Sequence, residues 1–428
     1  MNRRQFLKTA GLFAVGPLIL PRSLFGAGAP SKKITIGMIG TGRQGLYSNL
    51  PPFAQSEDCV VTAVCDVDAW RLQKAVASVE KYSGRKGCKA YHDFRELLAD
   101  PSIDAVMIST PDHWHVPMAI AAVKAGKDVA LEKPITRTIN EGRILADLVA
   151  KHKRVFRVDS EYRSKAHFHK AVELVRNGRI GKLHTVRTGS PKEEFPRESA
   201  KITPPPPDLD YDLWLGPAPQ AEYMQKRVHP QHSLWGRPGW MRNLDYCDGM
   251  ITNWGAHLND IAQWGANTER TGPIEVTATG VYHNDKVWNV LESFGASYRF
   301  ASGLEMHYIM SKAHVRFEGD KGWIEVSDPG HLEASDKAIL RQKIEPGELH
   351  FPLRTEKLDF IEAVKSRGQT LEDAEVGQRT TTLCHLAHIA IKLGGVKLHW
   401  DPDKELFPGN EAANKLLIRP PLRAPWTL

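Results

Sequence analysis

The sequence predicts an α/β protein whose first domain is built on a doubly wound parallel sheet and whose second half contains an antiparallel meander. Three observations lead to this fold class. An apolar run at 33–39 enters a glycine-rich turn, strands then alternate with helices as far as residue 152, and five closely spaced strands follow between residues 274 and 326. The length of 428 residues also favours two domains.

The glycine-rich turn has the spacing of a dinucleotide-binding fingerprint. The preceding run at 33–39 is short and apolar, which is typical of a buried strand. Glycines let the backbone approach a pyrophosphate closely, and the N-terminus of the following helix offers N–H groups to the phosphate oxygens. The predicted cofactor-binding residues of this turn are Gly40, Thr41, Gly42, Arg43, Gln44 and Gly45.

Asp66 follows the second strand, residues 60–64, and is the candidate ligand of the cofactor ribose. A carboxylate accepts hydrogen bonds from ribose hydroxyls and repels a 2′-phosphate, so we predict NAD as the cofactor. NADP remains an alternative because Arg43 and Arg71 carry charges that suit the phosphate. In a second interpretation, Asp66 is the N-cap of a helix over 68–76.

The alternation continues through helices at 94–99, 117–125 and 139–152 and strands at 105–109 and 128–131. In a doubly wound sheet, residues at the carboxyl ends of the strands face the ligand. The cofactor-binding candidates after these two strands are Thr110, Pro111, His113, Trp114, His115, Glu132 and Lys133.

Several motifs together resemble the glucose–fructose oxidoreductase / inositol dehydrogenase / MocA family. The motifs are the glycine turn, Thr-Pro-Asp-His-Trp-His at 110–115, Glu-Lys-Pro at 132–134, and segments 174–182, 214–217, 253–257 and 373–377. The resemblance implies an NAD(P)-binding Rossmann domain at 30–157 and a substrate domain at 158–400, with a large, open, mostly antiparallel sheet. It also implies a homodimer or tetramer, and we expect the tail at 401–428 to pack on the surface.

The resemblance further implies a catalytic pair. Lys133 matches the lysine of the Glu-Lys-Pro motif, which binds the substrate hydroxyl, and partial desolvation at a strand end would help it relay a proton. His257, in a helix expected over 253–265, matches the general acid/base. Asn253 stands where many relatives carry an aspartate, and an amide cannot stabilise a histidine cation as a carboxylate does. The alternatives are a surface lysine and a helix-packing histidine with Asn253 as N-cap.

Two segments supply candidate substrate ligands. Tyr162 and Arg163 open the second domain, and the aromatic-rich segment 211–246 contains Trp240 and Arg242. Aromatic faces stack on sugar rings, and arginine binds hydroxyl groups, so this segment predicts a carbohydrate cleft. Arg163 could instead form an ion pair at the domain interface, and the aromatic residues could fix an irregular loop.

Glu161 stands where the resemblance leads us to expect glutamine, and its role is open. Asn253 and His257 with one distant acid make a poor set of metal ligands, so we predict no metal. Five widely spaced cysteines contain no C-x-x-C pair and imply neither a disulfide framework nor a zinc site. The net charge of +7 is spread without long runs of one sign, which argues against a nucleic-acid partner.

The first 29 residues are expected to form a twin-arginine signal peptide. Arg3 and Arg4 precede an apolar stretch at 9–20, and small residues follow up to an A-x-A sequence at 27–29. The apolar stretch is too short to cross a bilayer. We therefore expect export to the periplasm through the twin-arginine machinery.

These features predict an NAD(P)-dependent oxidoreductase that acts on a hydroxyl group of a sugar, glycoside or polyol. Because the twin-arginine route carries folded proteins, the cofactor would be loaded before export and kept. A retained cofactor must be reset within the site, which leads to the alternative of a redox-assisted glycoside hydrolase or lyase with a 3-keto intermediate and no net redox. A third interpretation is a non-catalytic sugar-binding protein with a vestigial dinucleotide fold.

Overall fold

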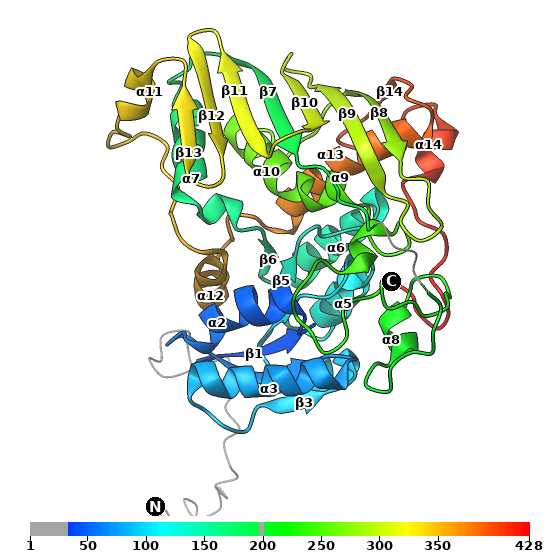
Figure 1. The fold of residues 1–428 in the computed structure, drawn as a ribbon. Helices are drawn as coiled ribbons and strands as arrows, with labels where there is room; N and C mark the ends of the chain where they lie inside the picture. The colour runs from blue at the N-terminus through cyan, green and yellow to red at the C-terminus, as the bar shows by residue number, and fades with distance from the viewer. Residues whose placement is uncertain (1–32, 197–200) are drawn as a thin grey trace, which may run out of the picture. The chain divides into compact units, whose positions relative to one another are not determined.

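The structure, a computed structural model, describes residues 33–196 and 201–428. The predicted signal peptide therefore lies outside the described residues. From Ile34 onward the chain carries two sheets (Figure 1). Within the described ranges, no helix combines the length and the apolar character needed to cross a membrane.

The first sheet has six parallel strands in the order β3-β2-β1-β4-β5-β6. Along β4, Val106 and Ile108 belong to one hydrophobic core and Ala105 and Met107 to another, so both faces are buried, as the predicted doubly wound sheet requires. The chain order reverses between β1 and β4, and such a switch point is where ligands bind. The strands are β1 Ile34–Ile39, β2 Cys59–Cys65, β3 Lys89–Tyr91, β4 Ala105–Ile108, β5 Asp128–Glu132 and β6 Phe156–Asp159.

Helices connect these strands, and one begins earlier than the sequence indicates. α5 starts at Asp112 rather than at Pro117, which lies inside the helix. Proline has the backbone angle φ that a helix needs and removes only one N–H, so the surrounding turns continue through it. The connecting helices are the π-helical turn η2 Gly45–Asn49, α2 Leu50–Ala54, α3 Ala69–Ser83, α4 Phe94–Ala99, α5 Asp112–Lys124 and α6 Ile139–His152.

The second sheet has eight strands in the order β13-β12-β11-β7-β10-β9-β8-β14. Only the β7–β10 pair is parallel among its pairings, so the expected mostly antiparallel sheet is confirmed. Its inner face shares a hydrophobic core with α7, α10 and α13 (Figure 1). The strands are β7 Leu183–Ser190, β8 Glu275–Tyr282, β9 Leu291–Arg299, β10 Glu305–Met310, β11 His314–Gly319, β12 Gly322–Ser327, β13 His331–Ala334 and β14 Leu398–His399.

The helix expected from Asn253 is divided in two. α9 Met250–Asn253 ends where α10 Gly255–Ala266 begins, with Trp254 between them. A side chain on Gly255 would come within 2.4 Å of Cys384 Sγ on α13 Ala374–Lys392, so glycine permits this close helix packing. The break places Asn253 at the end of one helix and His257 in the first turn of the next.

α12 Glu356–Ser366 lies in the range expected for the second domain but packs with the first sheet. Its Phe360 lies edge-on to Phe53, with ring centroids 6.4 Å apart, inside one of the two cores of that sheet. Near the C-terminus, the Trp426 ring packs on Trp114 at 4.7 Å. The remaining elements are η3 Tyr162–Ser164, α7 Ala166–Arg176, α8 Tyr211–Leu215, η4 Gly239–Arg242, α11 Lys337–Arg341 and α14 Glu411–Lys415.

Arg157 on β6 holds α12 to the first sheet through buried charges. Its Nε donates to Asp359 Oδ2 at 2.9 Å and its Nη1 donates to Glu372 Oε2 at 3.0 Å. All three side chains are almost completely inaccessible to solvent. Removing the cation would take the ion pair from Glu372 and leave Asp359 with the longer contact to Arg354 Nε at 3.8 Å.

We expect Arg157→Met to lower the free energy of unfolding by about 3–5 kcal/mol, because breaking a buried ion pair costs more than its replacement by an apolar side chain recovers. The measurement is urea denaturation followed by circular dichroism. Arg154→Met is the matched control, because Arg154 is a nearby arginine whose side chain donates to the backbone carbonyls of His152 and Gly126 and forms no ion pair with the residues that the structure describes. Equal losses in the two variants would contradict the assigned role of Arg157.

Candidate active site

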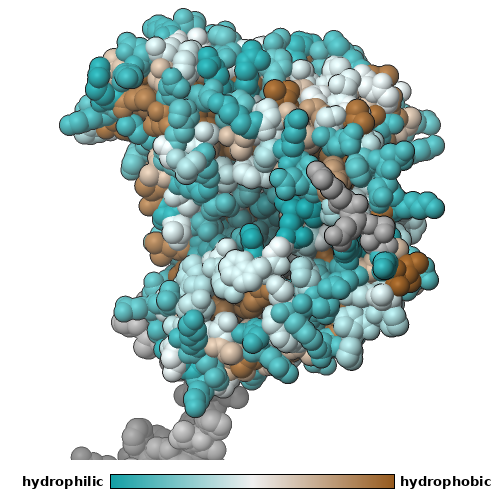
Figure 2. Space-filling model, viewed as in Figure 1, coloured by the Kyte–Doolittle hydropathy of each residue, from teal (hydrophilic) through white to brown (hydrophobic). Residues whose placement is uncertain are grey.

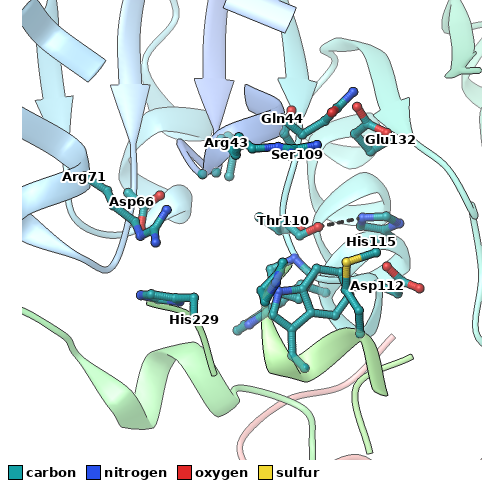
Figure 3. A pocket seen from close by; sticks show the side chains of 18 of the residues that line it. Arg43, Gln44, Asp66, Arg71, Ser109, Thr110, Asp112, His115, Glu132 and His229 are labelled. Atoms are coloured by element: carbon teal, nitrogen blue, oxygen red, sulfur yellow. Dashed lines mark hydrogen bonds between the residues drawn. The ribbon is translucent and has the colours of Figure 1, made fainter. Parts of the chain in front are cut away.

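A cavity of about 560 Å³ lies at the carboxyl ends of the first sheet and extends to the start of α10. Figure 2 shows the molecule hollowed on this face, with mainly hydrophilic residues around the hollow. In Figure 3, Asp66, Arg71 and His229 lie toward one end, and Asp112, His115 and Glu132 lie toward the other. The cavity therefore follows the line along which a doubly wound sheet binds a dinucleotide.

The glycine turn forms a cradle that a side chain would fill. A Cβ on Gly40, whose φ is +86°, would lie 2.6 Å from Ser109 O, and one on Gly45 would lie 2.4 Å from Gly40 O. At Gly42 the nearest atom to an added Cβ is Arg71 Nη1, at 3.6 Å, and this residue lines the cavity. Two glycines thus allow the tight turn, and the third leaves room for a ligand, as a pyrophosphate site requires.

Asp66 lines the cavity at the end of β2. Its Oδ2 accepts hydrogen bonds from Thr41 N at 2.7 Å and Thr41 Oγ1 at 2.9 Å, which tie the carboxylate to the glycine turn. The N-cap of α3 is Asp68, whose side chain accepts from the backbone N–H of Arg71. The N-cap interpretation of Asp66 is therefore wrong, and Asp66 lines the cavity with its Oδ1 accepting from the backbone N–H of Asp68 at 3.0 Å.

The residues after β4 divide between the cavity and the protein interior. Thr110, Pro111, Trp114 and His115 line the cavity. The His115 ring nitrogens lie 2.9 Å from Thr110 O, drawn as a dashed line in Figure 3, and 2.7 Å from Pro134 O.

Glu132 lines the same cavity after β5. One of its carboxylate oxygens accepts from Asn49 Nδ2 at 2.9 Å, and the same amide donates to Ser109 Oγ.

His113 does not lie among the residues that line the cavity. Its Nε2 is 3.1 Å from Trp214 O, which also accepts from Trp114 Nε1 at 3.0 Å. The ring is completely buried, and this burial lowers the pKa of His113 to about 3. The structure therefore places His113 in a packing position rather than in the predicted cofactor site.

Lys133 and Asn253 meet in the cavity. Lys133 Nζ donates to Asn253 Oδ1 and to the Asn253 backbone oxygen, both at 3.3 Å. Both residues line the cavity, so neither the surface-lysine interpretation nor the N-cap role for Asn253 describes their positions. Asn253 thus holds the Lys133 amine through its side-chain and backbone oxygens, and it adds no charge to the site.

His257 lines the same part of the cavity and carries a neutral ring. Its Nδ1 lies 2.8 Å from Ser160 Oγ and 3.7 Å from Glu161 Oε2. Burial lowers the pKa of His257 to about 3, the charges of Lys133 and Lys165 add to this effect, and Glu161 opposes it. A neutral imidazole at neutral pH has a lone pair with which it can accept a proton.

Of the four predicted substrate ligands outside the catalytic group, two line the cavity. Tyr162 lies against the His257 ring, with centroids 4.6 Å apart, and Trp240 also lines the cavity. Arg163 does not line it, because its guanidinium binds Asp260 through two hydrogen bonds of 2.7 and 2.6 Å. Arg242 is also directed elsewhere, with its Nε donating to Glu194 O at 2.6 Å.

Other cavity residues were not assigned from the sequence. Asp112 lies within the 110–115 motif but received no role, and burial raises the pKa of this carboxyl to about 6. Glu161 precedes two residues that were singled out. Arg237 lies in the segment 211–246 and Trp254 in the motif at 253–257, and neither is among the predicted site residues. Within residues 33–196 and 201–428, no three His, Cys, Asp or Glu side chains cluster in a way that could hold a metal ion.

The fold and the site are those of a protein built on an NAD-binding Rossmann domain. The profile described as "Oxidoreductase family, NAD-binding Rossmann fold" matches residues 34–160, and that described as "Oxidoreductase family, C-terminal alpha/beta domain" matches residues 194–428. The chain belongs to the Gfo/Idh/MocA oxidoreductase family.

Curated relatives carry the name glycosyl hydrolase family 109 protein. One from Shewanella pealeana is 34% identical over 166 residues, which are 33% of this chain and 35% of that protein. One from Stenotrophomonas maltophilia is 28% identical over 240 residues, 55% of this chain and 51% of that protein. The matched region thus spans about half of these relatives or less.

Solved structures share the fold over most of the chain. The aldose-aldose oxidoreductase from Caulobacter crescentus, complexed with glycerol, has a TM-score of 0.65 at 18% identity. The match covers 86% of this chain and 100% of the oxidoreductase chain. The scyllo-inositol dehydrogenase from Lactobacillus casei, with bound NAD(H) and scyllo-inositol, has a TM-score of 0.58 at 17% identity. The match covers 86% of this chain and 99% of the dehydrogenase chain.

We expect Asp66→Asn to raise the ratio of NADP to NAD bound by the protein about tenfold, equal to about 1.4 kcal/mol. The amide keeps an acceptor for Thr41 but removes the charge that repels a 2′-phosphate, while Arg71 remains in the cavity. The measurement is the amount of each nucleotide released when the purified protein is denatured. The same ratio in both proteins would contradict the assignment of Asp66 to the ribose.

We expect His113→Gln to remove part of the pH dependence of stability. The folded pKa of His113 is about 3, below its ordinary value of about 6.5, so the unfolded chain binds the proton first as the pH falls. The wild-type protein should therefore lose about 2 kcal/mol through this residue between pH 8 and pH 5, whereas the variant should not.

Urea denaturation of both proteins at pH 8 and pH 5 measures this difference. The assignment is supported if the free energy of unfolding of the wild-type protein, relative to that of His113→Gln, is about 2 kcal/mol lower at pH 5 than at pH 8. If this difference in the free energy of unfolding is the same at both pH values, the buried neutral ring of His113 is not the source of the pH dependence.

Proposed function

We propose that the protein is an NAD-dependent glycoside hydrolase that oxidises its substrate transiently and returns the electrons within one catalytic cycle. The observation that carries the proposal is that Lys133 and a neutral His257 line one cavity that also includes the glycine cradle. The name of the matched relatives, glycosyl hydrolase family 109 protein, supports glycoside cleavage over net oxidation.

The residues present fit the cofactor. Gly40, Gly42 and Gly45 would hold the pyrophosphate, and Asp66 would bind a ribose. When bound, NAD supplies reversible hydride transfer, which makes a sugar hydroxyl a ketone for part of the cycle and so acidifies the neighbouring C–H bond. The chain must therefore handle two protons, one from the hydroxyl and one from the adjacent carbon.

Lys133 and His257 are the groups available for these protons. The Lys133 amine, fixed by the two oxygens of Asn253, would hydrogen-bond the reacting hydroxyl oxygen. His257 is neutral and would accept a proton as a general base, then return it as an acid. Among the described residues Lys133 forms no ion pair with a carboxylate, so we expect its proton to pass to and from the substrate oxygen.

A second candidate function is net oxidation of a sugar or polyol by a separate oxidant. It is favoured by the fold shared with an aldose-aldose oxidoreductase and with inositol dehydrogenases, although the likeness at this identity concerns the fold alone. The two functions differ in a single measurable quantity, the net change in reduced nicotinamide per glycoside consumed.

We also propose export through the twin-arginine route, on the strength of Arg3 and Arg4 and the apolar stretch that follows. Export of a folded protein with its cofactor fits a cycle that needs no exchange of NAD. We expect a chain with both arginines replaced by lysine to remain in the cytoplasm. The unchanged chain should be exported.

The test of function uses the purified protein and a panel of aryl glycosides. We expect release of the aryl alcohol with no accumulation of reduced nicotinamide, and about 10²- to 10⁴-fold slower release by Lys133→Met. Lys124→Met, at the exposed end of α5, is the control. Reduced nicotinamide formed in proportion to substrate would favour net oxidation, and inactivity towards glycosides and polyols would favour a binding protein.

A further inference from the structure

The catalytic cycle proposed above creates an electrostatic problem at His257. Once its ring accepts a proton it becomes a buried cation, because only 7% of the side chain is exposed. The groups that face it include the two cations Lys133 and Lys165, the phenol of Tyr162, and the carboxylates of Glu161 and Asp328. Asn253, bound to Lys133, contributes no charge.

Glu161 is the carboxylate that lies beside the ring. Its Oε2 is 3.7 Å from His257 Nδ1, and in the described part of the chain no other carboxylate lies within 4 Å of that ring. Burial opposes ionisation of Glu161, but the pKa of the carboxyl is lowered by His257 when its ring is charged, by Lys133, by the backbone N–H of Glu161 itself and by Lys165. Glu161 is therefore negatively charged at neutral pH.

The other carboxylate, Asp328, is engaged elsewhere. It pairs with Lys165 Nζ and with His167 Nε2, the latter at 3.0 Å. Lys165 lies further from Glu161, at 3.8 Å, than from Asp328. The charge of Glu161 is thus left to face the imidazole.

We propose that Glu161 is the positioning residue of His257, an inference that rests on the proposed function. Its carboxylate, together with Ser160 Oγ at 2.8 Å, keeps the proton of the neutral ring on Nδ1. Nε2 then carries the lone pair that accepts the substrate proton, and the same carboxylate stabilises the resulting cation. Glu161, in the short segment after β6, therefore supplies the negative charge that the amide of Asn253 lacks.

The first test compares Glu161→Gln with a matched control. Glu292→Gln removes a glutamate that is also 45% exposed and also faces a histidine Nδ1, that of His283 at 3.0 Å, on the second sheet. We expect Glu161→Gln to lower kcat about 10- to 100-fold with little change in KM or in retained NAD. Glu161→Asp keeps the charge and should recover part of the loss, and Glu292→Gln should match the wild-type protein.

The second test needs no turnover. In ¹⁵N-histidine-labelled protein at pH 7, the His257 signals are identified by their loss in His257→Gln. We expect the Nδ1–H tautomer in the wild-type protein and in Glu292→Gln, and a shift towards the Nε2–H tautomer in Glu161→Gln. A purely structural role for Glu161 would not move this equilibrium.

The outcomes separate the two proposals. A tautomer shift in a protein that cleaves no glycoside would sink the proposed function but support the pairing of Glu161 with His257. An unchanged tautomer in Glu161→Gln would overturn the pairing, whether or not the wild-type protein is active. Equal kcat in Glu161→Gln and the wild-type protein would also overturn it.

Discussion

The bidentate ion pair between Arg163 and Asp260 is the contact on which the geometry of the site depends. The pair joins the segment after β6, which leaves the first sheet, to α10, which packs under the second sheet. Asp260 lies one helical turn beyond His257, and Arg163 follows Ser160 and Glu161 closely. Because both partners are buried and both hydrogen bonds are short and charge-assisted, small displacements are costly. The distances from His257 to Ser160 and Glu161 are set by this contact.

The same segment is held from its other side by Arg157, whose ion pairs reach α12 and Glu372. Two arginines, one on β6 and one in η3, thus fix a stretch of chain whose Val158 and Tyr162 pack into two different hydrophobic cores. Charged anchors of this kind add little net stability compared with apolar packing, but they specify one arrangement, since a misplaced partner leaves a buried charge unpaired. Precision at the site is therefore achieved by buried charge, whereas the two sheets are stabilised by apolar burial.

The fold was predictable from the sequence because it follows from local patterns. The apolar run before Gly40 and the alternation up to residue 152 indicate four of the six strands of the first sheet without any long-range information, whereas the short β3 and β6 were not placed. The Lys133–Asn253–His257 group could be named through the family resemblance. Arg163 was different: its charge suits a sugar hydroxyl and an ion pair equally, and only the fold shows that Asp260 lies opposite. His113 was misplaced because a helix has one face toward the cavity and another toward the core, and its starting point was five residues off.

The arrangement around Lys133 and His257 also bears on the proposed cycle without net redox. A dehydrogenase must release the hydroxyl proton to solvent at each turnover, while a hydrolase that returns its hydride keeps the proton in the site. His257 has a pKa lowered to about 3 by burial and lies deep in the cavity, so it binds a proton only while a substrate supplies one. Glu161 stabilises that transient cation without forming a direct hydrogen bond to the ring at 3.7 Å, and therefore without holding the proton permanently. In such a site, His257 accepts a proton from the substrate and returns it within the same cavity.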